Sequence, residues 1–216
     1  MTATAPPKIH GDFEAHLTVR SAYAEALERY AAANGLKYTH IVLDRGRVPS
    51  QPMLTIRASG PLAVVRDSIA ALTARLDAAG FPVVRTKIEA TPWATGVPTF
   101  DAEATVLGPR CYFEHHIKLL LTPETDLRAL TAHAVAHSAH LSANARRTRT
   151  DGRTERFVTQ RCRLVGDATA AARHLALLAA LRTAGYDILS AEREFVVHDS
   201  DESIDAGWII EGGEHP

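Results

Sequence analysis

Hydrophobic and polar residues alternate along positions 10–20, near the start of the chain. Phe13, Ala15, Leu17 and Val19 occupy one side of this stretch, and polar side chains occupy the other. Strict alternation predicts a β-strand that packs one face against helices and presents the other face to a polar environment. The next stretch has helical spacing, so the chain opens with a strand followed by a helix.

The same two periods recur along the rest of the chain. In the first half they predict a helix over 21–34, strands over 37–44 and 52–58, a helix over 62–79 and a strand over 82–90. In the second half they predict a strand over 111–121, a helix over 125–137, strands over 140–148 and 155–164, a helix over 167–184 and a strand over 186–197. Each half therefore has the element order β-α-β-β-α-β, which is that of the ferredoxin-like arrangement.

An internal repeat supports this division into halves. The matched segments are 13–19 with 113–119, 54–57 with 158–161, and 79–83 with 184–188, at offsets of 100, 104 and 105. We therefore predict an α+β protein built of tandem duplicated ferredoxin-like units, each with its own antiparallel sheet. The predicted divisions are a first unit over 10–90, a linker over 91–110, a second unit over 111–198 and an acidic C-terminal tail over 199–216.

The two sides of each strand are predicted to have different surroundings. The residues expected under the helices are Leu17, Val19, Ile56, Ile88, Ile117, Leu119, Val158 and Val197. On the polar side, the first strand of each unit carries a glutamate and a histidine, which its neighbouring strands should flank with an arginine and a second glutamate. These sets are Glu14, His16, Arg57 and Glu89 in the first half and Glu114, His116, Arg161 and Glu194 in the second.

The polar side carries residues suited to proton transfer. Histidine exchanges protons near neutral pH, a neighbouring carboxylate orients its ring, and arginine offers a planar fork for an anion. We therefore predict a small-molecule enzyme that uses acid–base chemistry on a phosphorylated or otherwise anionic substrate, in a cleft between the two units. The predicted catalytic residues are His16, Glu14, His116 and Glu114. The predicted substrate-binding residues are Thr18, Arg57, Glu89, Lys118, Thr159, Arg161 and Glu194.

One short motif resembles that of a known family. The tetrapeptide His16-Leu17-Thr18-Val19 is similar to the His-x-Thr motif of the 2H phosphoesterases, which carry one such motif in each of two pseudo-symmetric lobes. The corresponding tetrapeptide of the second half, 116–119, has Lys118 where the family has a hydroxyl residue. The resemblance covers four residues and implies phosphoester hydrolysis as one form of the predicted chemistry.

Four of the same side chains are suitable metal ligands. Glutamate and histidine together bind divalent transition metals, and the candidate two-Glu, two-His site consists of Glu14, His16, Glu114 and His116. Such ligands must converge within about 2.0–2.2 Å of one ion, which spacing along the chain does not establish. A divalent metal is therefore a further expectation for this site.

Composition limits the remaining function classes. The chain has 24 Lys and Arg residues against 25 Asp and Glu residues, so no overall positive charge recruits nucleic acid or an anionic membrane. No apolar run approaches the roughly 18 residues of a membrane-spanning helix. Two cysteines, Cys111 and Cys162, cannot form a disulfide framework, which favours the reducing cytoplasm.

Two other function classes remain open. An RNA-binding module is supported by a basic hairpin that contains Arg146, Arg147, Arg149, Arg153 and Arg156. Sheets that bind RNA usually present exposed aromatic residues for base stacking, and here the polar side of the strands is mainly charged. The third class is a non-catalytic scaffold that binds a ligand, and a row of charges on a solvated sheet face requires no function at all.

Overall fold

Eight strands and five α-helices follow one another along residues 8–148 and 151–208, which this computed structural model describes; for 145–148 it describes the backbone alone. The first half contains β1 (His10–Val19), α1 (Ala24–Ala33), β2 (Lys37–Leu43), β3 (Ser50–Pro61), α2 (Leu62–Ala78) and β4 (Val83–Ala90). After α3 (Asp101–Leu107), the second half contains β5 (Tyr112–Leu121), α4 (Leu127–Ala136), β6 (Ala139–Thr148), β7 (Thr154–Arg163), α5 (Asp167–Thr183) and β8 (Asp187–Asp199). Two 3₁₀ turns, η1 (Ser21–Tyr23) and η2 (Glu202–Asp205), follow β1 and β8.

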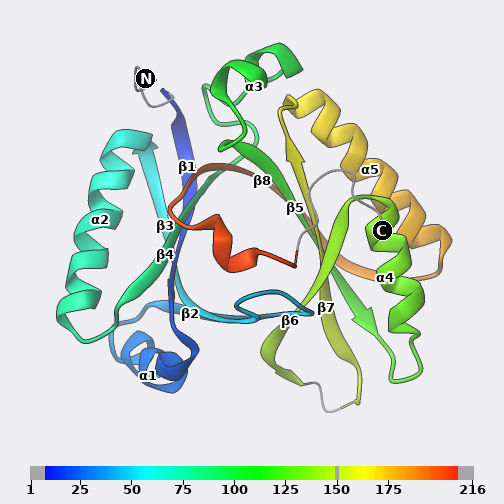
Figure 1. Ribbon diagram of the computed structural model, residues 1–216, viewed down its shortest axis with the longest axis horizontal. Coiled ribbons are helices and arrows are strands. Elements are labelled where there is room, and N and C mark those ends of the chain that lie inside the picture. Colours follow the sequence, from blue (N-terminus) through cyan, green and yellow to red (C-terminus); the bar gives the residue numbers. More distant parts are fainter. Residues whose placement is uncertain (1–7, 149–150, 209–216) are drawn as a thin grey trace.

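The strands join edge to edge in one closed antiparallel barrel. Their order around it is β1-β3-β2-β6-β7-β5-β8-β4, so that each half contributes four neighbouring strands (Figure 1). Two pairings join the halves, β2 with β6 and β4 with β8. The helices α1 and α2 lie outside the strands of the first half, and α4 and α5 lie outside those of the second (Figure 1).

The prediction of two ferredoxin-like units with separate antiparallel sheets is wrong, because all eight strands form a single sheet. A four-stranded sheet has two edges, and the backbone N–H and C=O groups along those edges need partners. In the barrel, β2 and β4 of the first half find these partners on β6 and β8 of the second. The alternation of residues predicts where strands lie, but it carries no information about which edges meet.

Local sequence determines where several helices begin and end. The carboxylate of Asp126 caps α4 by accepting hydrogen bonds from the backbone N–H groups of Arg128 (2.8 Å) and Ala129 (3.2 Å). Gly80 and Gly185, with φ angles of 87° and 82°, follow α2 and α5 in the left-handed conformation that favours glycine after a helix. Within the described residues, no helix has the length and apolar character that a membrane crossing requires.

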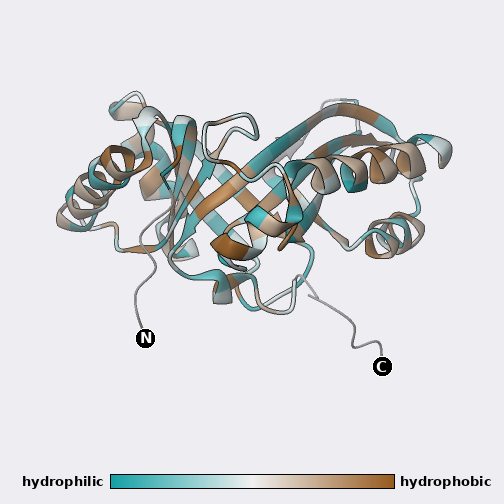
Figure 2. Ribbon diagram, turned by 90° about the horizontal axis from the view of Figure 1, so that it is seen from above, coloured by the Kyte–Doolittle hydropathy of each residue, from teal (hydrophilic) through white to brown (hydrophobic). Residues whose placement is uncertain are grey.

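The hydrophobic core lies between the barrel and its helices, in one cluster for each half. The predicted burial is confirmed for Leu17, Val19, Ile88, Ile117, Leu119, Val158 and Val197, whereas Ile56 is partly exposed. Hydrophilic and hydrophobic residues alternate along the strands in the middle of the molecule (Figure 2). Because the apolar residues face the helices, the polar side of every strand faces the inside of the barrel. It is therefore not the open sheet face that the sequence suggested.

The register of the strands repeats between the halves. His16 lies opposite Thr55 of β3, and His116 lies opposite Thr159 of β7. The glutamates two residues earlier on β1 and β5 likewise lie opposite the second glutamate of their half, on β4 and β8. The internal repeat of the sequence thus corresponds to equivalent positions within one sheet.

The segment over 91–110 contacts both halves. Thr95 and His10 exchange two backbone hydrogen bonds, of 3.0 and 2.9 Å, beside the start of β1. The N–H of Asp167, at the start of α5, donates to the carbonyl of Pro98 at 2.9 Å. Gly166 permits this close approach, because a Cβ atom there would lie 2.4 Å from the carbonyl oxygen of Thr99.

Candidate functional site

A cavity of about 190 Å³ lies inside the barrel, and all eight strands contribute to its wall. We call it the inner cavity. Nine of the predicted site residues line it: Glu14, His16, Thr18, Glu89, Glu114, His116, Thr159, Arg161 and Glu194. The barrel therefore brings most of both predicted sets into one enclosed space, although they are about 100 residues apart in the sequence.

His16 is held by residues on both neighbouring strands. Its Nδ1 lies 3.1 Å from the hydroxyl of Thr55, and its Nε2 lies 3.0 Å from a carboxylate oxygen of Glu89. Glu14 is farther from Nε2, at 3.8 Å. A hydroxyl on one ring nitrogen and a carboxylate on the other fix the orientation of an imidazole and prepare it for proton transfer.

His116 has an equivalent hydroxyl partner and two carboxylates. Its Nδ1 lies 3.1 Å from the hydroxyl of Thr159, and its Nε2 lies 3.4 Å from oxygens of both Glu114 and Glu194. Burial alone lowers the pKa of His116, but the hydrogen bonds to the two glutamates outweigh it and raise the pKa to about 10. His116 therefore carries a positive charge at neutral pH.

A buried lysine connects the two halves of the site. The ammonium of Lys87, on β4, lies 2.6 Å from Glu89 and also contacts Glu114 of β5. Both glutamate side chains are almost fully buried. Burial favours their neutral forms, but the charge of Lys87 holds the pKa of each carboxyl below its usual range. Lys87 thus keeps two buried carboxylates ionised beside the two histidines.

The C-terminal segment closes one end of the inner cavity. Asp205 of η2 forms ion pairs with Arg85 (3.0 Å) and Arg161 (2.6 Å), and Asp199 accepts two hydrogen bonds from Arg85. The indole of Trp208 donates to the carbonyl of Leu141 at 2.8 Å. In Figure 1 this segment, drawn in red, lies between the strands of the two halves.

A second cavity, of about 710 Å³, lies at the opposite end and is called the outer cavity. Its wall includes Arg57, Trp93 and residues of β8. Arg57 is 83% exposed and pairs with Glu14 at 3.3 Å, so it lies outside the inner cavity. The volume falls within the roughly 300–1,000 Å³ that is typical of ligand sites.

One predicted residue lies away from both cavities. Lys118, the counterpart of Thr18, pairs with Glu155 at 3.6 Å and lies over the ring of Phe157. Thr18 is buried beside His16 in the wall of the inner cavity. Within the described residues, one half therefore presents the complete His-x-Thr pattern to the cavity and the other half presents the histidine alone.

Sequence reasoning missed Arg85, Lys87 and Asp205 as parts of the site. The alternation along 82–90 puts Arg85 and Lys87 on the polar side of their strand, but that position alone indicates no role. Asp205 belongs to an acidic stretch whose spacing does not match a calcium-binding loop. The sequence offers one indication of these roles, which is the number of charged residues on the polar side of the strands. If that side is buried, its cations require carboxylate partners from another part of the chain.

The structure favours a different set of metal ligands from the predicted four. Ligand atoms of Glu89, His116 and Glu194 lie within 4.8 Å of one another. Ligands that share one ion each lie about 2.0–2.2 Å from it, so three atoms this close together are a candidate ligand group. The ammonium of Lys87 on Glu89 and the proton of His116 already supply the positive charge that an ion would bring to this group.

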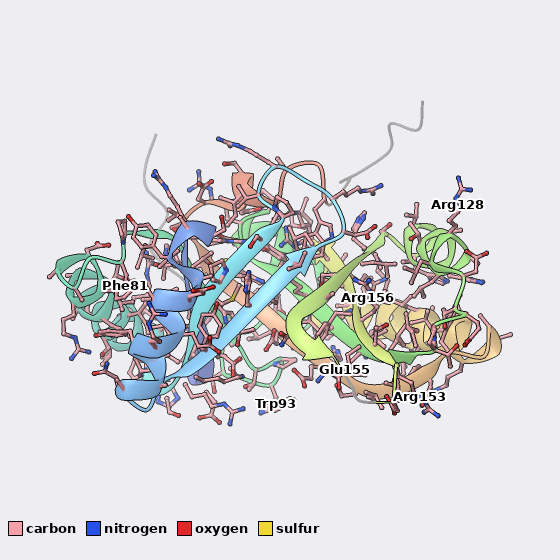
Figure 3. The ribbon with its side chains drawn as sticks, turned by 90° about the horizontal axis from the view of Figure 1, so that it is seen from below. Phe81, Trp93, Arg128, Arg153, Glu155 and Arg156 are labelled. Atoms are coloured by element: carbon pink, nitrogen blue, oxygen red, sulfur yellow. The ribbon has the colours of Figure 1, made fainter. Side chains whose placement is uncertain are left out.

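The basic hairpin joins β6 to β7. Side chains of Arg146, Arg147 and Arg149 lie outside the described residues. Arg153 and Arg156 lie at the hairpin in Figure 3, and Arg153 pairs with Asp151 at 3.9 Å. The polar face of the sheet, on which an RNA strand would stack, is enclosed by the barrel. This enclosure weakens the argument for an RNA-binding module.

Neither the family models nor the curated proteins that were compared with this sequence give a match. The function is therefore argued from the geometry of the two cavities.

Proposed function

We propose that this protein is a small-molecule enzyme in which His16 transfers a proton to or from a substrate bound inside the barrel. The observation that carries the proposal is the convergence of two oriented histidines, each with a hydroxyl and a carboxylate partner, on one enclosed cavity. A concave site that combines such groups with strongly shifted pKa values is typical of an active site.

The two histidines have different roles in this proposal. His116 holds its proton between Glu114 and Glu194, so it acts as a fixed positive charge and hydrogen-bond donor. His16 has one close carboxylate, Glu89, at the Nε2 atom where a substrate proton would be exchanged. His16 is therefore the general acid or base, and His116 stabilises negative charge that develops on the substrate.

The contacts of Arg161 bear on the charge of the substrate. Arg161 was predicted to bind an anionic group, but it already donates to Glu114 (2.5 Å) and Asp205 (2.6 Å). A neutral or positively charged substrate therefore fits the site better than a phosphorylated one. The free, buried thiols of Cys111 and Cys162 favour a reducing compartment, and we propose the cytoplasm.

Turnover measurements on matched histidine variants test the proposal. The wild-type protein is assayed against a panel of small esters, amides, phosphoesters and amines that report hydrolysis or proton abstraction. For any substrate that turns over, His16→Ala should lower the rate by roughly 10²–10⁴-fold. His133→Ala, which changes an exposed histidine on α4, is the control and should leave the rate unchanged.

Full activity in the His16→Ala, His116→Ala double variant would refute the assignment of these residues. A protein that binds small molecules from the panel but converts none of them would instead support the non-catalytic scaffold. That alternative is favoured by one observation, the dense set of ion pairs that fixes the wall of the inner cavity.

A further inference from the structure

The inner and outer cavities meet at a group of carboxylates. Four lining residues are common to both cavities, and all four are glutamates: Glu14, Glu89, Glu192 and Glu194. They come from β1, β4 and β8, three strands that are neighbours in the barrel. A molecule that moves from the outer cavity toward His16 therefore passes between negative charges.

Positive charge is scarce in the wall of the outer cavity. Asp12 adds a fifth carboxylate, whereas Arg57 and Arg193 are the cationic side chains among the described residues of this wall. The guanidinium of Arg193 pairs with Asp167 of α5, which is not part of the wall. Arg57 pairs with Glu14, and Lys87 and His116 of the inner cavity pair with Glu89 and Glu194. Asp12 and Glu192 have no cationic partner within the described residues, and their charges give the outer cavity a negative potential that attracts cations.

One of the shared glutamates, Glu192, has unused capacity to bind a ligand. Glu192 is exposed and makes no hydrogen bond or ion pair within the described residues. Glu89 is 2% exposed and already paired, with the ammonium of Lys87 2.6 Å from its Oε1 and Nε2 of His16 3.0 Å from its Oε2. Of these two carboxylates, Glu192 is therefore the one that a cationic ligand would pair with.

An exposed aromatic ring lies at the rim of the same cavity. Trp93 follows β4, is 80% exposed and points away from the body of the protein in Figure 3. A large apolar side chain in water is a feature of ligand and partner sites. The indole face attracts cations, and exposed cation–π contacts are worth roughly 0.5–1 kcal/mol.

We propose that the outer cavity binds an organic cation, an alkylammonium group, between the shared glutamates and the indole of Trp93. An alkylammonium compound would then be the substrate class of the site described above, an assignment that rests on the proposed function. The ammonium group would lie beside Glu192 and Glu194, and the rest of the molecule would extend into the inner cavity toward His16. Carboxylates satisfy the charge, and the indole covers the alkyl groups.

Calorimetric titration of the intact protein tests the inference without requiring turnover. The probes are tetramethylammonium and n-butylammonium chloride, with tert-butanol as the neutral comparison and sodium acetate and inorganic phosphate as the anions. Ionic strength is matched between the probes with sodium chloride, and the ammonium titrations are repeated at higher sodium chloride concentrations. We expect both ammonium ions to bind, to quench tryptophan fluorescence, and to bind more weakly as salt is raised.

Two variants locate the binding. Glu192→Gln should weaken ammonium binding by about three- to fivefold, and Trp93→Ala should weaken it by about two- to fivefold. Glu124→Gln, on an exposed turn before α4, is the matched control and should bind like the wild type. Equal affinity for tert-butanol, tighter binding of acetate or phosphate, or unchanged affinity in both variants would overturn the inference.

The test separates the inference from the proposed function. His16 is not among the residues that line the outer cavity, so His16→Ala should retain ammonium binding even where turnover is lost. Retained turnover in His16→Ala together with specific ammonium binding would refute the catalytic role alone. Loss of turnover in His16→Ala without any preference for ammonium ions would refute the inference alone.

Discussion

The two ends of the barrel are built from equivalent strand positions, yet one is open and the other is closed. At the open end, Arg57 is 83% exposed and pairs with Glu14, which is itself partly exposed. At the closed end, its counterpart Arg161 is 6% exposed and lies between Glu114 and Asp205. The C-terminal segment thus converts one of two similar openings into a wall, and among the described residues no equivalent segment covers the other.

The same contrast applies to the residues that lie opposite the histidines. Lys87 is the partner of His16 across β1 and β4, whereas Glu192 is the partner of His116 across β5 and β8. The ammonium of Lys87 also reaches Glu114, so one cation of the first half neutralises carboxylates of both. The two equivalent positions therefore carry opposite charges, and the halves are joined by the ion pairs of Lys87.

The largest expected effect is that of removing the shared cation. Lys87→Met leaves Glu89 and Glu114 buried without their main positive partner, and breaking a buried ion pair typically costs about 3–5 kcal/mol. We therefore expect the free energy of unfolding, measured by urea denaturation with circular dichroism, to fall by about 5 kcal/mol or the protein to be unfolded.

The matched variant at the equivalent position is Glu192→Gln. Glu192 is exposed and unpaired within the described residues, so its replacement should change the free energy of unfolding by less than about 0.5 kcal/mol. If Lys87→Met were as stable as Glu192→Gln, the two halves would not depend on a shared charge.

The second prediction compares the two arginines directly. Arg161→Ala removes one cationic partner from each of the buried carboxylates of Glu114 and Asp205, and we expect a loss of about 3 kcal/mol in the free energy of unfolding. Arg57→Ala removes an exposed ion pair and should cost under about 1 kcal/mol. Equal losses in the two variants would show that the ion pair between Arg161 and the C-terminal segment does not make the closed end more stable than the open end.

The sequence predicted individual strands better than it predicted their assembly. Alternation placed Leu17 and Ile117 under the helices correctly, and it placed His16 and His116 on the polar side. It could not show that the polar side is enclosed, because closure depends on pairing between strand edges of different halves. Backbone groups make those contacts, and they are the same for almost every residue type.

The prediction of the site residues from the sequence has a similar limit. The internal repeat predicted that Glu89 and Glu194 lie near the histidines. Residues at equivalent positions of the two halves pair in equivalent register in the sheet. Asp205 follows no repeat and belongs to a segment that returns to the barrel after its last strand. Its role depends on the unbalanced charge of Arg85 and Arg161 inside a closed barrel, which becomes evident only when the barrel is known.

The third prediction concerns the charge of His116. Its pKa of about 10 in the folded protein lies above the unfolded value of about 6.5. The stabilisation from its ionised form is therefore complete below pH 6.5 and is lost as pH rises toward 10. Stability of the wild type should fall between these values, and His116→Gln should reduce the slope of stability against pH. If NMR shows that the imidazole of His116 titrates below pH 8, the assigned pairing with Glu114 and Glu194 is wrong.

The smallest expected effect concerns the threonine hydroxyl that each half places beside its histidine. Thr55 and Thr159 each place a hydroxyl 3.1 Å from Nδ1 of a histidine, in the same strand register. Valine keeps the shape of threonine but removes this partner, and leaving a buried polar group unsatisfied costs about 1–3 kcal/mol. Thr159→Val should therefore cost an amount near the lower end of that range in urea denaturation. Thr55→Val should cost slightly more, because the hydroxyl of Thr55 also lies 3.2 Å from that of Thr39. Because both histidines are partly exposed, water can replace part of the lost bond in either half. A large difference between the two variants would mean that the histidines are held unequally, so that the contrast between the halves would begin at the imidazoles and not at Lys87 and the C-terminal segment.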